Sequence, residues 1–288
     1  MTSMSKLLNT IICLFLALLT VGRSLAETPP PPEPPRQIVL EGARNFRDLG
    51  GYPAGNGYRV AYGRIFRSDN LSHLSVQDWQ TLRKLGIGTV VDFRSAEEVQ
   101  ATPPQAPAGI RVKALPIGFA GMNIEDFRKR LMSGDLDREL QIQTYSNIAL
   151  KQSESYRQWF ALLQQAPVGS VFHCTSGKDR TGLAAVLLLT TLGVPREIAL
   201  EDFVASNTFL KEGIEVTLRN IRKNPSFKGN EQDIRRLLGV ERRQMEQTIA
   251  DIEARYGSLD RYLEDVLGVG EKERKTLQSL YLEAIPSD

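Results

Sequence analysis

A short strand that runs into a long apolar helix constrains the fold of this 288-residue chain more than any other feature. Ser170–His173 is typical of a short buried strand, and Thr181–Leu192 is almost wholly apolar, as expected of a helix that is covered on all sides. Such a pair needs packing layers on both faces of a sheet. The sequence therefore predicts an α/β fold, with a mainly parallel central sheet flanked by helices.

The segments around this pair fit the same prediction. Ser75 and Ser95 each begin a capping box, which Asp78 and Glu98 close three residues later, so a helix is expected to follow each serine. Other strands and helices are expected within residues 58–66, 89–93, 111–117 and 156–163, and after Pro195. The last third of the chain is helical and more polar, and it either packs on the core or forms a lid over it.

The first 26 residues have the pattern of a signal peptide. Lys6 precedes an apolar stretch over residues 7–21, and Ser24-Leu25-Ala26 supplies small residues for cleavage. The stretch is short for a membrane span, so no stable span is expected after cleavage. Residues 27–37 hold six prolines and predict an extended linker, followed by one domain over residues 38–288. The protein is expected to be exported, to the periplasm or out of the cell.

Two cysteines and two histidines limit the chemistry that is available, namely Cys13, Cys174, His73 and His173. They are too few for a Cys/His zinc cage beside a separate catalytic site, so no metal site is expected. A disulfide framework is excluded unless the two cysteines pair. Removal of residues 1–26 takes away Cys13 with two basic and no acidic residues, and the formal charge of +2 falls to zero. A nucleic-acid partner is therefore not expected.

The chemically informative segment is the loop between the strand and the helix, His173–Gly182. Cys174 stands at the carboxyl end of the strand and near the amino end of the helix, where unpaired N–H groups and the helix dipole favour an anion. The same field favours the thiolate form of a cysteine and makes Cys174 a candidate nucleophile. Arg180 follows six residues later, so its guanidinium and the loop amides can surround one phosphate. Thr181 is placed to donate its hydroxyl to the sulfur.

Other interpretations of this loop fit less well. The loop is not of the nucleoside-triphosphate type, because Asp179 stands where Ser or Thr is needed and Phe172 stands where the first glycine belongs. A purely structural Cys174 would not explain the charged residues beside it. A non-catalytic phosphate-binding module and a sulfurtransferase stay as alternatives. The intact Cys174 and Arg180 oppose the first, and the Arg-Thr-Gly helix start opposes the second. His173 is expected to support the loop through hydrogen bonds.

The loop His173–Gly182 resembles the Cys-x5-Arg signature of the protein tyrosine phosphatase superfamily, in the form of the atypical bacterial tyrosine and dual-specificity phosphatases. Residues 45–51 and 63–68 are similar to the N-terminal motifs of this family, and residues 256–268 are similar to its C-terminal helices. The resemblance covers about residues 38–285. It implies a phosphatase domain with the family's α/β fold and a helical lid in the C-terminal third.

The resemblance also implies a mechanism without a metal or cofactor. Cys174 attacks phosphorus and forms a cysteinyl-phosphate, while Arg180 and the loop amides stabilise the equatorial oxygens. A carboxylic acid protonates the leaving oxygen and then activates water. The implied substrates are phosphotyrosine proteins, with phosphoserine, phosphothreonine and phosphoinositides or inositol phosphates as further candidates. The residues implied to line the substrate are Thr175, Ser176, Gly177, Lys178, Asp179 and Thr181.

Asp92 is the first candidate for the acid. It ends the strand over residues 89–91, and if that strand runs parallel to Ser170–His173, both ends open on the same edge of the sheet. The Asp-x-Arg-Ser pattern that starts at Asp92 is also similar to the strand end that carries the acid in the resembling family. Alternatively, Asp92 pairs with Arg94 or caps the next helix. Asp179 and Asp126 are the other candidates for the acid.

Two basic features bear on the substrate. Lys178 adds a cation near the pocket, as in the phosphoinositide phosphatases of the superfamily, or it is a solvated lysine at the helix start. Residues 211–243 carry nine basic and five acidic residues. This segment is either a surface for an anionic substrate or a solvated helical face.

Overall fold

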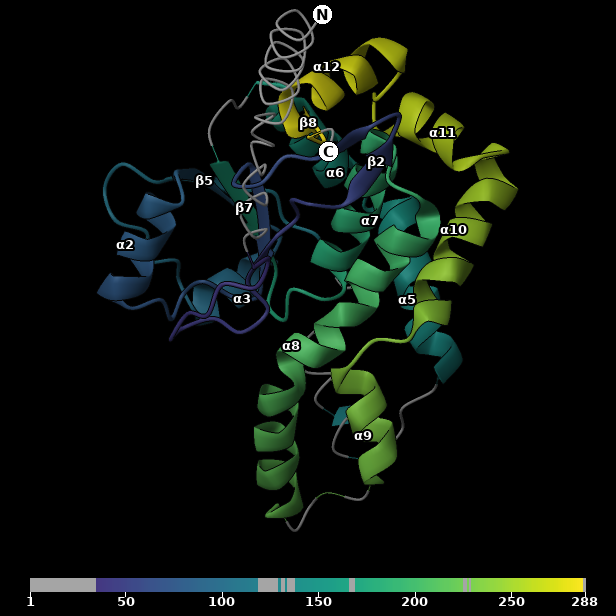
Figure 1. Cartoon of the computed structure of the whole chain (residues 1–288). Helices are drawn as coiled ribbons and strands as arrows, with labels where there is room; N and C mark the ends of the chain where they lie inside the picture. The colour runs from purple at the N-terminus through teal and green to yellow at the C-terminus, as the bar shows by residue number, and fades with distance from the viewer. Residues whose placement is uncertain are drawn as a thin grey trace, which may run out of the picture. The chain divides into compact units, whose positions relative to one another are not determined.

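The computed structural model describes residues 35–118, 129–130, 133, 138–165, 169–224, 227 and 229–286. The expected signal peptide, most of the expected linker, and Asp126 lie outside these residues. The chain from Pro35 onward forms one unit (Figure 1).

The central sheet has five strands in the order β1-β4-β7-β5-β6. β4, β7, β5 and β6 run parallel, and β1 pairs with β4 in the antiparallel sense. β7 is buried at every residue and lies in the middle of the order. The prediction of a mainly parallel sheet is confirmed. The strands are β1 Arg47–Asp48, β4 Ile65–Ser68, β5 Ile87–Asp92, β6 Arg111–Ala114 and β7 Gly169–His173.

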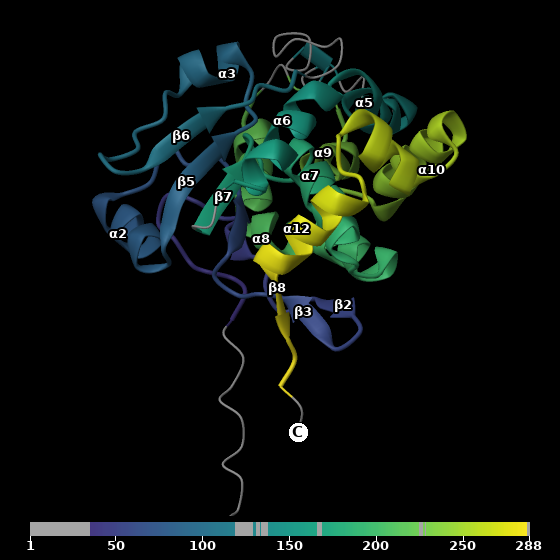
Figure 2. The same ribbon diagram turned by 90° about the horizontal axis from the view of Figure 1, so that it is seen from above.

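Helices cover both faces of this sheet, as Figure 2 shows. Successive side chains of a strand point to opposite faces, and β7 follows this rule. Val171 belongs to the apolar cluster that includes residues of helix α2, and Phe172 belongs to the larger cluster that includes residues of α7. Both faces of the sheet are therefore covered by apolar side chains. This explains why polar and apolar residues do not alternate along β7 as they do in a strand with one solvent-facing side. The helices are α2 (Val76–Lys84) on one side and α5 (Arg138–Lys151), α6 (Ser153–Leu163) and α7 (Arg180–Leu192) on the other.

Both predicted capping boxes are present. In α2, the Ser75 hydroxyl accepts from the backbone of Asp78, and the Asp78 carboxylate accepts from the backbone of Ser75. Ser95 and Glu98 make the same reciprocal pair at the start of α3, which spans Ala96–Ala101. These bonds satisfy N–H groups that a helix leaves unpaired in its first turn. They also fix Glu98 close to the carboxyl end of β5.

The last third of the chain is helical, as predicted. Some of its helices pack on those that cover the sheet, and α8 and α9 also pack on each other. α10 packs against α5 and α12 packs against α7. α8 and α9 pack against each other through a small apolar cluster of their own, which includes Leu218 and Ile234. The helices are α8 (Arg196–Arg222), α9 (Glu231–Leu238), α10 (Arg242–Tyr256), α11 (Leu259–Arg261), a π-helical turn η1 (Tyr262–Val266) and α12 (Glu271–Tyr281).

A second, three-stranded sheet was not anticipated from the sequence. It consists of β2 (Pro53–Gly55), β3 (Tyr58–Val60) and β8 (Leu282–Ala284), all antiparallel. The strand candidates within residues 58–66 therefore belong to two different sheets. Figure 2 shows β8 beside β3. Within the described ranges, no helix is both long enough and apolar enough to cross a membrane.

Candidate active site

The signature loop joins β7 to α7, as the sequence predicts. Cys174 directly follows β7 and is only 1% exposed, whereas Thr175 is exposed. Gly177 has a φ of +65°, and a Cβ there would lie 2.3 Å from the carbonyl oxygen of Ser68. Only glycine fits this conformation and this contact. The loop is thus packed tightly against the carboxyl end of β4.

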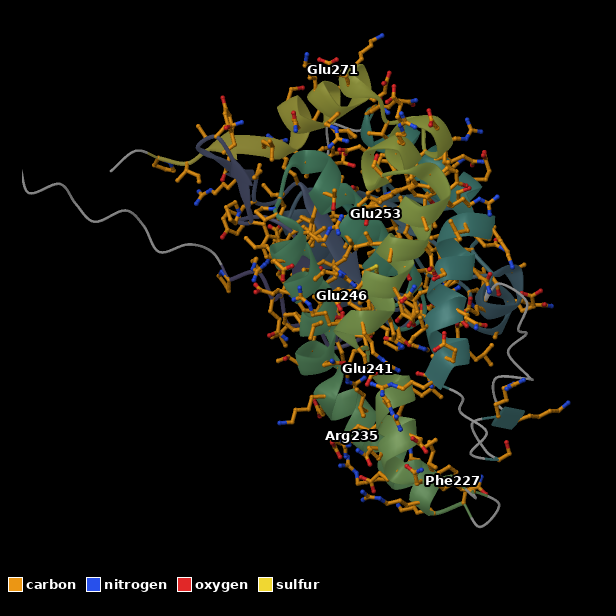
Figure 3. All side chains as sticks on the ribbon, turned by 90° about the vertical axis from the view of Figure 1, so that its right-hand side faces the viewer. Phe227, Arg235, Glu241, Glu246, Glu253 and Glu271 are labelled. Carbon is orange, nitrogen blue, oxygen red and sulfur yellow. The ribbon has the colours of Figure 1, made fainter. Side chains whose placement is uncertain are left out.

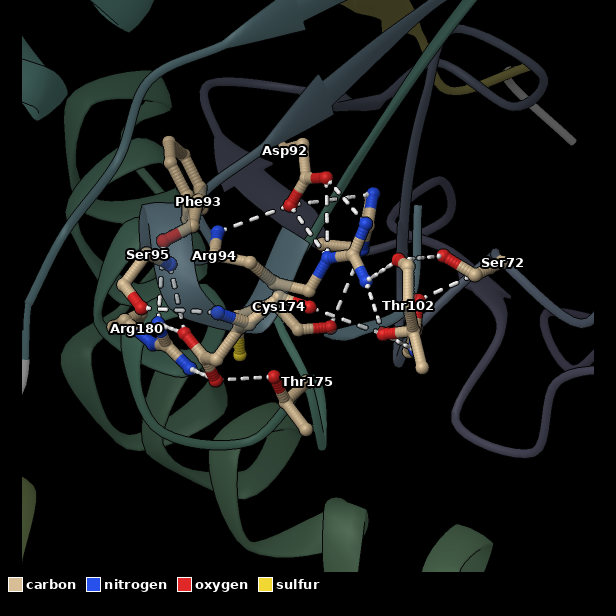
Figure 4. A network of polar contacts seen from close by, with 12 residues as sticks. Ser72, Asp92, Phe93, Arg94, Ser95, Thr102, Cys174, Thr175 and Arg180 are labelled. Atoms are coloured by element: carbon tan, nitrogen blue, oxygen red, sulfur yellow. Dashed lines mark hydrogen bonds and ion pairs between the residues drawn. The ribbon is translucent and has the colours of Figure 1, made fainter. Parts of the chain in front are cut away.

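Arg180 is held by Glu98 in a bidentate ion pair (Figure 4). Its Nη1 donates to Glu98 Oε2 at 2.6 Å, and its Nη2 donates to Oε1 at 2.8 Å. Nη1 also donates to the Ile117 carbonyl at 3.0 Å. Burial lowers the pKa of Arg180, but the Cys174 sulfur and Glu98 outweigh this effect and raise the pKa above its ordinary value. The guanidinium is therefore charged and fixed in direction.

Glu98 has a function that its sequence pattern did not indicate. The pattern predicts only the helix cap, and the same carboxylate also binds Arg180 and accepts from the Thr175 hydroxyl. Burial raises the pKa of Glu98, but the hydrogen bonds and charge of Arg180 outweigh it and lower the pKa to about 2. The nearest signal in the sequence is the position of Glu98, six residues after the end of β5, at the edge where the loop also lies.

Asp92 ends β5, which runs parallel to β7 with Asp92 opposite His173. Its carboxylate accepts from the Arg94 backbone at 2.9 Å, from Arg94 Nε at 3.0 Å and from Arg94 Nη2 at 2.7 Å (Figure 4). The side chain is buried. The carboxyl ends of β5 and β7 thus lie at the same edge of the sheet, as expected. Asp92 also pairs with Arg94, which was the alternative role considered for it. The acid role of Asp92 stays a prediction.

His173 is buried next to Cys174. Its Nδ1 lies 3.2 Å from the Cys174 carbonyl oxygen, and its Nε2 lies 3.7 Å from Asp92 Oδ1. Burial lowers the pKa of His173 to about 4, although Asp92 acts in the opposite direction. The imidazole is therefore neutral at pH 7, where it orients the start of the loop without carrying charge.

Lys178 and Asp179 form a pair within the loop. Lys178 Nζ donates to Asp179 Oδ1 at 2.8 Å and to the Leu237 carbonyl of α9 at 3.2 Å. The Tyr145 hydroxyl of α5 donates to the same Asp179 oxygen. Lys178 is buried, so it is not the solvated lysine that one interpretation expects. The Asp179 side chain keeps 20% of its surface exposed.

Thr181 and Gly182 complete the helix start. Both are buried, and the Thr181 hydroxyl has no hydrogen-bond partner in the part of the chain that the structure describes. Its expected bond to the sulfur therefore stays a prediction. At Gly182 a Cβ would lie 2.8 Å from the Phe203 ring of α8, so the missing side chain allows α7 and α8 to approach closely.

A tyrosine phosphatase family model matches residues 38–283. The chain belongs to this family. A Cupriavidus necator protein named as a tyrosine-protein phosphatase is 33% identical over 240 residues, which cover 81% of this chain and 84% of that protein. The triple specificity protein phosphatase PtpB of Mycobacterium tuberculosis is 33% identical over 192 residues, 58% of this chain and 68% of PtpB.

One solved structure, that of P. aeruginosa TpbA, matches 63% of this chain and 90% of its own at 16% identity. Its TM-score of 0.30 is too low to add to the argument. The family match and the two relatives confirm the resemblance that the signature loop indicates, and they identify the chain as a tyrosine phosphatase.

The basic segment of this tyrosine phosphatase, residues 211–243, is largely paired with acidic side chains. Arg222 and Arg235 pair with Glu231 of α9, and Arg235 also pairs with Glu215. Further along, arginines of α5, α8 and α10 pair with the glutamates that Figure 3 labels along α10. Five of the six arginines of this segment thus form ion pairs, which favours the solvated-face interpretation over an open anion-binding surface.

Proposed function

We propose that this tyrosine phosphatase hydrolyses phosphate monoesters through a cysteinyl-phosphate at Cys174. The observation that carries the proposal is the position of Cys174 at the amino end of α7. Arg180 lies on the same loop, where Glu98 of α3 fixes its guanidinium. The Sγ thiolate attacks phosphorus, the ester P–O bond breaks, and the leaving oxygen takes a proton from a carboxylic acid. Water then attacks phosphorus, the acid group takes back a proton, and the S–P bond breaks.

Of the two acid candidates that the structure describes, Asp179 is the one we propose. Asp92 has its carboxylate occupied by three donors from Arg94 and is buried. Asp179 lies in the signature loop and retains exposed surface, and both Tyr145 and Lys178 donate to the same one of its oxygens. A proton donor must reach the leaving oxygen. Both carboxylates are ion-paired, but Asp179 lies in the loop itself and keeps exposed surface, whereas Asp92 is buried.

Two matched substitutions test the assignment of the acid. Asp179→Asn is expected to lower kcat by about 10²–10⁴-fold for an alkyl phosphate, to lower it far less for p-nitrophenyl phosphate, and to remove the basic limb of the pH profile. Asp92→Asn is expected to keep that limb and to lose stability instead. If Asp92→Asn loses the basic limb and Asp179→Asn keeps it, the two roles are reversed.

Phosphotyrosine peptides are the proposed main substrates. The cation of Lys178 is already shared by Asp179 and the Leu237 carbonyl, so it is poorly placed to add affinity for a polyanionic headgroup. Turnover of phosphotyrosine, phosphoserine and phosphothreonine peptides, phosphoinositides and inositol phosphates is measured side by side. A higher kcat/KM for phosphoinositides than for every peptide would overturn this preference.

Comparison with Cys174→Ser separates the alternatives. The phosphatase proposal predicts turnover that this variant abolishes and a cysteinyl-phosphate that acid quenching traps in the wild type. Slow turnover that is unchanged in Cys174→Ser would favour a non-catalytic phosphate-binding module. Sulfur transfer from thiosulfate to cyanide would favour a sulfurtransferase.

Export is proposed on the sequence pattern of residues 1–26. When the full sequence is expressed in a bacterial host, the exported protein is expected to begin at Glu27, as read by mass spectrometry of its N-terminal peptide. Recovery of only the uncleaved chain in the cytoplasm would contradict the proposal.

A further inference from the structure

Two buried side chains hold carbonyl groups of the signature loop from behind. The side-chain nitrogen Nδ2 of Asn45 donates to the carbonyl oxygens of Ser176 at 3.1 Å and Gly177 at 3.0 Å. Nη2 of Arg67, on β4, donates to the same Gly177 oxygen at 2.7 Å. Asn45 and Arg67 are both fully buried. Two consecutive peptide units of the loop are thus fixed in direction by side chains from outside it.

Asp202 of α8 holds these donors in place. It accepts from Arg67 Nη1 at 2.5 Å and from Arg47 Nε at 2.8 Å, and the Tyr52 hydroxyl also donates to it. Nη1 of Arg47 in turn donates to the Asn45 side-chain oxygen at 2.5 Å, which fixes the orientation of that amide. All five side chains are buried. The network therefore runs without a break from α8 through β1 and β4 to the loop.

Asp202 and Arg47 both remain ionised at neutral pH. Burial raises the pKa of Asp202, but Arg47 and Arg67 outweigh it and hold the pKa well below its usual range. Burial lowers the pKa of Arg47 to about 10, which still leaves it charged at pH 7. Two guanidinium groups thus face one carboxylate, and the excess positive charge lies behind the loop, where it favours an anion in front.

The direction of a carbonyl fixes the direction of the next N–H group. In a trans peptide unit the two point to opposite sides, because the unit is planar. With the Ser176 and Gly177 carbonyls pulled toward Asn45 and Arg67, the N–H groups of Gly177 and Lys178 are directed away from these side chains. In a phosphate-binding loop, such N–H groups are the donors to the oxyanion.

We propose that Asn45 and Arg67 are positioning residues for the phosphate-binding amides of the signature loop, and that Asp202 keeps both in place. They do not touch the reacting atoms. They act by preventing two peptide units of the loop from turning over, a change that would point carbonyl oxygens at the phosphate. The expected effect on turnover rests on the proposed function. The expected effect on oxyanion affinity does not depend on it.

Asn45→Asp is the decisive substitution. It keeps the volume of the side chain and the acceptor for Arg47, but it replaces the donor to both loop carbonyls with an oxygen. Tungstate serves as the probe, and its affinity is measured by isothermal titration calorimetry. The variant is expected to bind tungstate at least tenfold more weakly and to lose at least tenfold in kcat for p-nitrophenyl phosphate. Arg67→Lys is expected to fall between this variant and the wild type.

Asn207→Asp is the matched control. The side-chain amide of Asn207, on α8, also donates to a backbone carbonyl, that of Val240, and its side-chain oxygen accepts from the Val240 backbone, so it is bonded away from the loop. The control is expected to lose a similar amount of thermal stability and to keep tungstate affinity within twofold. If Asn45→Asp does not fold, Asn45→Ser carries the same test, because it removes both donors without adding charge.

Tungstate affinity and kcat within threefold of the wild type, in a folded Asn45 variant, would overturn the inference. So would an equal loss in the Asn207→Asp control. A wild type that binds tungstate but hydrolyses no phosphate ester would refute the proposed function. The affinity comparison would still decide whether Asn45 and Arg67 position the loop.

Discussion

At the scale of single residues, the site depends on side chains that have two tasks. The Glu98 carboxylate closes the cap of α3 and fixes Arg180, and His173 contacts both the Cys174 carbonyl and Asp92. Each of these side chains is buried, so a change in its charge is not relieved by water. Charge substitutions and changes of pH are therefore expected to affect activity and stability most at these buried side chains.

Glu98→Gln is predicted to impair Arg180 while sparing the helix cap. Glutamine can still accept from the Ser95 backbone, but it loses the charge-assisted pairing with both guanidinium nitrogens. A misdirected guanidinium is expected to lower kcat/KM by about 10–100-fold. Steady-state kinetics with p-nitrophenyl phosphate measure this. Glu97→Gln, on the exposed side of the same turn, is the control and is expected to match the wild type. An active Glu98→Gln would contradict the role of Glu98.

Stability is predicted to fall as the pH is lowered from 7 to 5, in part through His173. The folded protein lowers the pKa of His173 from 6.5 to about 4, so the unfolded chain binds the proton more readily over this range. The contribution of the neutral imidazole is complete above pH 6.5 and is lost as the pH approaches 4. The expected loss between pH 7 and pH 5 is about 2 kcal/mol. Urea unfolding of His173→Asn should show a shallower pH dependence, and parallel curves would refute the prediction.

At the scale of elements, the sequence predicted best where one local pattern decides the structure. The apolar run of α7, the buried residues of β7 and the two capping boxes each follow from neighbouring residues, and all are present. The sheet of β2, β3 and β8 was missed because its strands are short and its last strand comes from the far end of the chain.

The same distinction separates the parts of the site. Cys174 and Arg180 lie in one loop, so the local pattern of residues 173–182 is enough to propose them as a pair. The pairs Glu98–Arg180 and Asp202–Arg67 join residues more than 80 positions apart, and no local pattern indicates such a contact. For Asp92 the sequence left two roles open, and the contact that distinguishes them, its pairing with Arg94, is visible only in the structure.

The second half of α8, from Leu210 onward, and α9 are predicted to open more readily than the core. Their apolar cluster is small and separate, and α9 is tied to the loop by the bond between Lys178 and the Leu237 carbonyl. Ile234→Ala removes a fully buried side chain of that cluster, at a cost of about 2–5 kcal/mol. Hydrogen exchange by mass spectrometry should show faster exchange in residues 231–238, with β7 and α7 unchanged. Val216→Ala, at a partly exposed site of α8, is the control. Uniform loss of protection across the chain would contradict local opening.

At the scale of the whole molecule, residues 35–288 are predicted to be sufficient for the fold. The contacts divide the chain between Pro34 and Pro35, and every described contact of the site lies after that point. A chain shortened to residues 35–288 is therefore expected to keep its melting temperature within about 2 °C and its kcat unchanged. Calorimetry and steady-state kinetics measure both. A large drop in the melting temperature would show that the earlier residues contribute to the folded unit.

The wide spacing of the residues that support the loop has a consequence for how the enzyme is made. Asn45 and Arg67 are synthesised early, Glu98 later, and Asp202 only after Cys174 itself. Until Asp202 has left the ribosome and α8 has docked, the carboxylate that anchors Arg67 is missing. If Asn45 and Arg67 position the loop as we propose, nascent chains and fragments that end before α8 are expected to contain Cys174 without a working site. Phosphatase activity is then expected to appear only once α8 has docked.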